Sequence, residues 1–188
     1  METVKVYNII DVGLTASAMI RLFKKGSKDT IREQIYQDVE RVFEAKSRDD
    51  FDKMHSNFCD WGVKNISLAK KNKCASYGQI AKTLNVVLKV AIYYSHLPDC
   101  DKSRELSKWL HAAVDTKMMK ELKKNYPNDI PWPATIEQVD KEETYRGIQQ
   151  IVWKFIEEKH EAAITTPVEF EEIYWRKLNR KNEIELES

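Results

Sequence analysis

Apolar residues recur every three to four positions along most of the chain, which is the periodicity of amphipathic helices. The segment 30–45 is the clearest example, because its apolar residues form one stripe: Ile31, Ile35, Val39, Val42 and Phe43. Glycine and proline are scarce, at five each, which disfavours a turn-rich β architecture. The pattern predicts helices at about 11–24 (ended by Gly26), 30–45, 47–61, 76–96, 105–110, 115–126, from 135 or 140 to 160, and from 167.

Several helix starts are marked by polar residues in the context of an N-cap. These residues are Ser47, Ser76, Asp115 and Thr166. Ser76 is followed three residues later by Gln79, which predicts a capping box. Thr166 is followed by Pro167 at the first helical position and by Glu169 at the third. The central helix, which begins at Ser76, is expected to continue to about His96 and to stop before Pro98.

The predicted fold class is therefore all-α. We expect a single globular multi-helix domain of about eight helices over residues 1–188, arranged so that two lobes can share a cleft. The segment 126–135 contains three prolines and cannot be helical, so it is expected to wrap across the surface or to cross between lobes. The polar tail 181–188 is expected to be frayed.

The composition, with 42% hydrophobic and 32% charged residues, is that of a soluble protein, and no apolar run approaches the roughly 18 residues that span a membrane. The N-terminus has no basic region followed by an apolar stretch, so no secretory signal is expected. Three cysteines without CxxC spacing and four scattered histidines favour reduced thiols in a cytoplasmic protein, with no disulfide framework and no metal site. We expect no cofactor.

Charge is distributed unevenly along the chain. No acidic residue occurs between Asp60 and Asp99, although this stretch contains several lysines: Lys64, Lys70, Lys71, Lys73, Lys82 and Lys89. Acids prevail from Glu137 to Glu172, and we attribute the acidic residues at 169–172 to the dipole at the start of the last helix. A basic region of this kind can attract phosphates, which indicates a nucleic acid as partner. The alternative is that the lysines only solvate helix surfaces.

One face of the central helix is polar. Lys82, Asn85, Lys89 and Tyr93 follow one another at spacings of three, four and four, so they are expected to share that face. The stripe can be an ordinary solvent face. It can also line a groove, because Val86 and Val90 flank it closely, and partial burial would then lower the pKa of Lys82 towards that of a usable nucleophile.

Two short segments resemble the helix-hairpin-helix DNA glycosylases. Residues 78–88, GQIAKTLNVVL, resemble the second half of that family's hairpin, in which glycines precede a catalytic lysine at the start of an apolar helix. Residues 113–120 begin with AVDT and resemble the family's Val-Asp-Thr segment, whose aspartate is catalytic and starts a helix. Together the two segments and their surroundings cover about a quarter of the chain, and they occur in the family's order.

The resemblance implies base excision from DNA by base flipping, with DNA as the partner. Lys82 would attack the sugar C1′ as a neutral amine and leave a Schiff base that permits strand cleavage, and Asp115 would stabilise the developing sugar cation. If Lys82 stays protonated, Asp115 could activate water instead, which gives a glycosylase without lyase activity. The residues expected to contact DNA or the flipped base are Gly78, Gln79, Asn85, Lys89, Lys70, Lys71, Lys73, His111 and Lys120.

The chain departs from the family pattern in several places. Ile80 replaces the second hairpin glycine, whose backbone helps to hold a phosphate, and Lys120 replaces an arginine. Lys82 and Asp115 are 33 residues apart, which is longer than in most members although a divergent 8-oxoguanine branch is comparable. No cysteine follows Asp115, so the iron–sulfur cluster of some members is not expected.

Two further hypotheses remain open at this point. The spacing of Arg104 and His111 resembles the Arg-x6-His pair of HEPN ribonucleases, since seven residues are two helical turns and would place both side chains on one face. A non-catalytic helical module could instead use the basic face to bind a nucleic acid or an acidic protein. For Asp115, N-capping is a purely structural alternative, and one residue can both cap a helix and act in catalysis.

Overall fold

The computed structural model describes residues 3–70, 73–159 and 164–174. Within these ranges the chain forms α-helices and short irregular helices and no strand, so the all-α prediction is confirmed. The elements are α1 (Thr3–Ala16), the 3₁₀ helix η1 (Ala18–Leu22), α2 (Ser27–Phe43), α3 (Arg48–Asn65), α4 (Tyr77–Leu88), the π-helix η2 (Lys89–Tyr94), α5 (Cys100–Ser107), α6 (Thr116–Asn125), the 3₁₀ helix η3 (Ile136–Gln138), α7 (Glu142–Lys159) and a last helix at 167–174.

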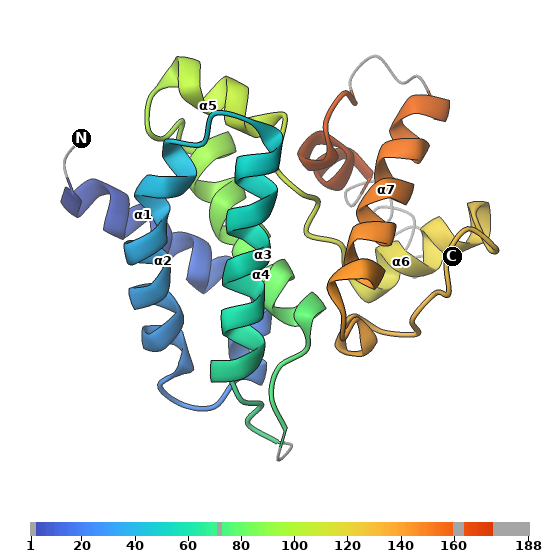
Figure 1. Ribbon diagram of the computed structural model, residues 1–188, viewed down its shortest axis with the longest axis horizontal. Helices are drawn as coiled ribbons and strands as arrows, with labels where there is room; N and C mark the ends of the chain where they lie inside the picture. Colours follow the sequence, from blue (N-terminus) through green and yellow to red (C-terminus); the bar gives the residue numbers. More distant parts are fainter. Residues whose placement is uncertain (1–2, 71–72, 160–163, 175–188) are drawn as a thin grey trace, which may run out of the picture.

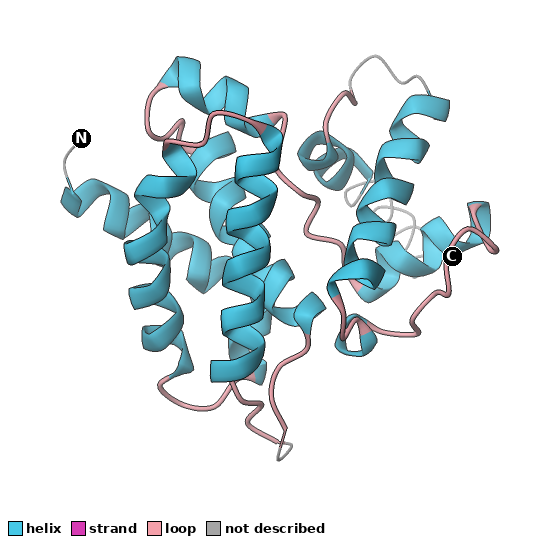
Figure 2. Ribbon diagram, in the orientation of Figure 1, coloured by secondary structure: helices cyan, strands magenta, loops and turns pink. Residues whose placement is uncertain are grey.

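The helices form two groups. Figure 1 shows α1 to α5 on one side of the molecule and α6, α7 and the helix 167–174 on the other. The non-helical segments 108–115 and 126–135 lie between or around these groups, as the loops of Figure 2 show. The predicted tail 181–188 lies outside the described residues. No helix in the described ranges is both long enough and apolar enough to cross a membrane.

The central helix α4 is buried on almost all sides. It packs against α1 and α3, and also contacts η1, η3 and α7. Two glycines allow the closest of these contacts, because a Cβ added to Gly13 of α1 would lie 2.8 Å from Val87 Cα, and one added to Gly62 of α3 would lie 2.5 Å from Ile80 Cγ2. Because glycine has no side chain, α1 can approach the α4 backbone at Val87, and α3 can approach the Ile80 side chain of α4.

The helix starts that were predicted from an N-cap agree closely with the structure. Ser47 caps α3 by accepting a hydrogen bond from Asp50 N, and Ser76 and Gln79 form the capping box of α4. The expected end of α3 at Gly62 is wrong, since the helix continues to Asn65 and the glycine is a packing position instead. The first helix also begins earlier than expected, at residue 3, and Gly26 precedes α2 with a positive φ of 90°.

The end of the central helix differs from the expected α-helix. Residues 89–94 are wound as a π-helix, and the Ser95 N–H donates to Val90 O five residues back. The helical segment then ends before Pro98, as predicted. Because a π-turn contains more residues than an α-turn, every side chain after Lys89 is displaced around the helix axis relative to a straight α-helix.

We expect Gly13→Ala to destabilise the protein although alanine favours helices. The added methyl group would collide with the Val87 backbone. After the gain in helix propensity is subtracted, this overpacking should lower the free energy of unfolding by about 1–2 kcal/mol. Urea denaturation followed by circular dichroism measures the change.

Gly147→Ala is the matched control on α7. Its Cβ would lie 3.2 Å from Ile130 Cγ2, a flexible side-chain atom, so the variant should be as stable as the wild type or slightly more stable. Equal stability of the two alanine variants would contradict the close packing of α1 on α4.

Candidate functional site

A pocket of about 350 Å³ lies where the two helix groups meet. Its lining combines charged and apolar side chains from four stretches of the chain: Ala16, Ala18, Lys82, Val86, Lys89, Val90, Tyr94, Ala113, Asp115, Met118, Glu171 and Glu172. Pockets of roughly 300–1,000 Å³ with an apolar lining and a few converging polar groups are typical of small-molecule sites in proteins. We call this the junction pocket.

Lys82 and Asp115 face each other in the junction pocket. Lys82 Nζ lies 3.8 Å from Asp115 Oδ2, and the two side chains are only 14% and 22% exposed. The separation is that of an ion pair without a close hydrogen bond. Burial lowers the pKa of Lys82 below its usual value, because the effect of desolvation on the ammonium exceeds the opposing attraction of Asp115.

Asp115 also caps α6. Its Oδ1 accepts a hydrogen bond from Met118 N at 2.9 Å, while Oδ2 is the oxygen nearest to Lys82. The carboxylate is thereby held in orientation by the helix end, and its second oxygen is directed towards the amine. The predicted cap and the predicted approach to Lys82 are both present in one side chain.

A second lysine, Lys89, occupies the same pocket with two carboxylates. Its Nζ lies 2.5 Å from Glu171 Oε1 and 2.9 Å from Glu172 Oε1. Burial disfavours the ammonium, but the two acids outweigh this effect and raise the pKa of Lys89. The explanation of these glutamates by the dipole of the last helix is therefore wrong: only Glu169 acts at the helix start, where it accepts hydrogen bonds from Thr165 N and Thr166 N.

The backbone that leads to Asp115 is fixed by buried side chains from three elements. Ala112 donates its N–H to Gln149 Oε1 and accepts from Gln149 Nε2, each at 3.0 Å, and its carbonyl also accepts from Asn85 Nδ2 at 3.0 Å. Ala113 N donates to Glu171 Oε2 at 2.8 Å. The position of Asp115 relative to Lys82 therefore depends on α4, α7 and the last helix together.

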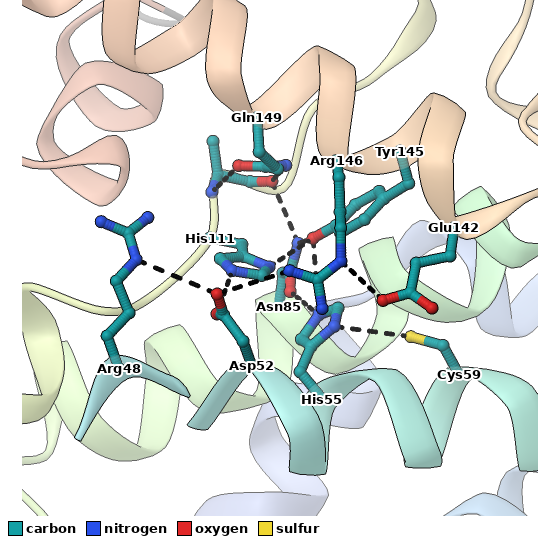
Figure 3. Close-up of polar contacts among 11 residues, drawn as sticks. Arg48, Asp52, His55, Cys59, Asn85, His111, Glu142, Tyr145, Arg146 and Gln149 are labelled. Atoms are coloured by element: carbon teal, nitrogen blue, oxygen red, sulfur yellow. Dashed lines mark hydrogen bonds and ion pairs between the residues drawn. The ribbon is translucent and has the colours of Figure 1, made fainter. Parts of the chain in front are cut away.

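Asn85 belongs to a buried hydrogen-bond network beneath this backbone (Figure 3). His55 Nε2 lies 2.8 Å from Asn85 Oδ1, and the Asn85 amide donates to Tyr145 Oη at 2.9 Å. The Tyr145 hydroxyl is 2.9 Å from His111 Nδ1, and His111 Nε2 is 2.9 Å from Asp52 Oδ1. These hydrogen bonds can therefore all be donated in one direction. The Asn85 amide donates to the Tyr145 hydroxyl, the hydroxyl donates to the His111 imidazole, and the imidazole donates to the Asp52 carboxylate.

The network is uncharged at its centre and charged at its rim. Burial lowers the pKa of His55 from 6.5 to about 3, so this imidazole is neutral in the folded protein. At the rim, Asp52 is 3.5 Å from Arg146, which also bonds Glu142 at 2.6 Å. Burial alone would raise the pKa of Asp52, but the hydrogen bond from His111 and the nearby cations lower it.

The structure does not bring several predicted DNA contacts to the surface. Gly78 is buried and donates its N–H to Val139 O at 2.8 Å, and a Cβ at this position would lie 2.7 Å from Val139 Cβ. Gln79 is 2% exposed and its side chain accepts from Ser76 N as part of the capping box. The backbone N–H groups of Gly78 and Gln79 therefore cannot hold a phosphate in this structure, because internal acceptors already bond them.

Asn85 and His111 do not line the junction pocket either. Both are buried, at 3% and 6% exposure, and both bond within the network, so neither can touch DNA directly. The predicted shared face of the central helix is accordingly only partly right. Lys82 and Lys89 face the pocket, whereas Asn85 points into the protein.

The basic residues have different surroundings. Lys70 and Lys120 are exposed, Lys73 forms an ion pair with Glu137 at 2.6 Å, and Lys71 lies outside the described residues. On α6, Lys120 is accompanied by Lys123 and Lys124, which are also exposed. The accessible cations closest in sequence to Asp115 are therefore on α6.

The structure contradicts the geometry expected for an Arg104–His111 pair. Arg104 is on α5, is exposed and pairs with Asp101, whereas α5 ends at Ser107 and His111 is buried in the following non-helical segment. The two side chains do not share a helix face, and a shared face was the basis of the comparison with HEPN ribonucleases.

No protein-family model, no curated protein and no solved structure matches this chain. Among the described residues, no group of three His, Cys, Asp or Glu side chains lies close enough to hold a metal ion. The chemistry of the junction pocket must therefore be inferred from its own side chains. Among the charged and aromatic residues of the pocket, Glu171, Glu172 and Tyr94 are those that the sequence did not single out as functional.

We expect the free energy of unfolding to decrease as the pH falls from about 6.5 towards 4. The unfolded chain protonates His55 near pH 6.5, whereas the folded protein resists protonation down to about pH 3. The unfolded state thus binds more protons in this window, which favours unfolding by up to about 1.4 kcal/mol per pH unit. Urea titrations at a series of pH values measure the slope.

His55→Gln removes the titrating ring and keeps a group that can donate to Asn85. It should flatten the pH dependence, even if it lowers stability at pH 7, whereas His96→Gln at an exposed position should retain the wild-type slope. The same slope in both variants would exclude His55 as the source.

Proposed function

We propose that the protein is a DNA glycosylase that excises a damaged or modified base and can cleave the resulting abasic strand. The observation that supports this proposal most strongly is the Lys82–Asp115 pair: a desolvated amine 3.8 Å from a carboxylate that is fixed at a helix N-terminus, inside a pocket of about 350 Å³. An amine nucleophile with a carboxylate beside it suits substitution at a sugar carbon.

In this proposal Lys82 attacks C1′ of the flipped nucleotide as a neutral amine. The C1′–N bond breaks, and the base leaves with the bonding electron pair and takes up a proton. The lysine nitrogen then gives one proton to Asp115, and its lone pair forms the C1′=N bond as the C1′–O4′ bond breaks. O4′ keeps the electrons of that bond and takes up a proton, which opens the sugar ring and leaves a protonated Schiff base between Lys82 and C1′. The lowered pKa of Lys82 supports the first step, because it increases the fraction of neutral amine near neutral pH.

Asp115 has two roles in the proposal. Its carboxylate stabilises the positive charge that develops on the sugar as the base leaves, and its nearness to Nζ makes it an acceptor for the proton that Lys82 releases. The hydrogen bond from Met118 N holds one carboxylate oxygen in place, which limits reorganisation during the reaction. Helix capping and catalysis are compatible here because they use different oxygens.

DNA would be held by side-chain cations and not by the hairpin backbone. The exposed lysines of α6, Lys120, Lys123 and Lys124, follow the element that carries Asp115 at its start. Phosphate contacts of this kind make binding depend strongly on salt concentration. Lys120 therefore stays in the proposal as a DNA contact, together with exposed Lys70.

Borohydride should trap the protein covalently on DNA that contains a suitable modified base or an abasic site, and Lys82→Ala should abolish the trapping. The loss follows because borohydride reduces only the Schiff base that the Lys82 amine forms. Denaturing gel electrophoresis of labelled DNA measures the adduct.

Lys53→Ala removes an exposed lysine from another pocket and serves as the control, with trapping expected at the wild-type level. DNA binding without either trapping or base release, across a broad panel of modified bases and abasic DNA, would refute the glycosylase proposal. It would favour the non-catalytic nucleic-acid-binding module instead.

The rate of trapping should rise with pH until Lys82 is deprotonated, at a pKa below the 10.5 of an ordinary lysine. Asp115→Asn removes a charge that raises this pKa, so the profile of the variant should shift to lower pH. Its maximal rate should fall by about 10²- to 10⁴-fold, since the carboxylate no longer accepts protons. A shift to higher pH would contradict the proposed coupling of the two groups.

A further inference from the structure

The π-helix η2 determines which aromatic side chain reaches the junction pocket. A straight α-helix turns about 100° per residue, so Tyr93 would face within about 20° of Lys82, and Tyr94 would face about 120° away. The wide turn of η2 reverses this outcome. Tyr94 lines the junction pocket together with Val86 and Val90, and Tyr93 lines a different pocket with His96 and Arg104.

Tyr94 presents a large accessible aromatic surface at this position. It is 48% exposed, while the neighbouring Tyr93 is half-buried and packs against the core. The two rings meet at 75° with centroids 5.3 Å apart, which is an edge contact. π-turns within α-helices are frequently found at functional sites, which fits this placement.

The pocket around Tyr94 has a polar part and an apolar part. The polar part consists of Lys82 with Asp115 and of Lys89 with Glu171 and Glu172. The apolar part includes Val86, Val90, Ala113 and Met118 beside the tyrosine. A ligand that suits both parts has a flat π-face for the ring and hydrogen-bonding groups at its edge. Nucleobases combine these two properties.

We infer that Tyr94 is the stacking platform for a nucleobase that enters the junction pocket. The inference deepens the proposed function, on which it rests for the identity of the ligand as a base in DNA. Stacking on Tyr94 would hold the face of the extruded base, and the charged groups of the pocket could then form hydrogen bonds with its edge. Substrate preference would then depend on stacking strength and edge contacts together.

Fluorescence of 2-aminopurine tests the inference without requiring catalysis. The probe is a single-stranded oligonucleotide with one 2-aminopurine between inert abasic spacers. Its emission is therefore not already quenched by neighbouring bases and falls when the base stacks on an aromatic ring. The wild type should quench the probe, and Tyr94→Phe should do so equally, because stacking needs no hydroxyl group. Tyr94→Ala should lose the quenching and bind the oligonucleotide about tenfold more weakly or worse.

Tyr93→Ala is the matched control on the adjacent residue. It should quench and bind like the wild type, because Tyr93 does not line the junction pocket. Free 2-aminopurine riboside distinguishes a nucleoside site from a DNA site: strong quenching of the riboside alone would assign the pocket to a free nucleoside. Equal effects of the two alanine variants, or no quenching by the wild type, would overturn the inference.

Trapping on abasic DNA separates this inference from the proposed function. An abasic site has no base to stack, so Tyr94→Ala should still be trapped by borohydride through Lys82. Quenching without any trapping would leave the base platform in place and refute the glycosylase. Trapping with unchanged quenching in Tyr94→Ala would support the glycosylase and refute the platform.

Discussion

The hydrogen bonds to the Ala112 and Ala113 backbone are the constraint on which the candidate site depends. Gln149 binds both polar groups of Ala112, and Glu171 accepts from Ala113, so the chain is fixed two residues before Asp115. Buried polar groups stabilise a structure only when they are bonded, and a single missing partner leaves a costly unpaired group. The polar interior therefore favours one position of Asp115 relative to Lys82 over others.

The two pocket lysines show how geometry divides their roles. Lys89 lies within 2.9 Å of two carboxylates and is stabilised as a cation, whereas Lys82 has one acid at 3.8 Å and a lowered pKa. Both side chains are similarly buried, so the difference arises from the number and distance of the acids. Lys89 with its two glutamates joins the helix groups through ion pairs, and Lys82 is the amine that can lose its proton.

The sequence predicts local features of this protein well and distant contacts poorly. The caps at Ser47, Ser76 and Asp115 were recognisable because a cap depends on residues within one turn. The role of Gly62 depends on Ile80, and that of Glu171 on Lys89, 82 residues away, so neither can be deduced from neighbouring residues. The π-turn at 89–94 likewise has no short sequence signal, and it changed the pocket-facing tyrosine from 93 to 94.

The geometry agrees with one part of the resemblance to helix-hairpin-helix glycosylases, the lysine–aspartate pair, and disagrees with another, the phosphate-binding hairpin. Lys82 and Asp115 converge, but the Gly78 N–H is bonded to Val139 O and cannot hold a phosphate. Backbone amides hold a phosphate at a fixed position, whereas exposed lysines attract it with little positional control. If the protein acts on DNA, the strand must therefore be placed mainly by contacts within the junction pocket. The surface lysines would supply the affinity for DNA, and binding of the base in the pocket would set the position of the strand. Recognition of the base would then also place its sugar at Lys82.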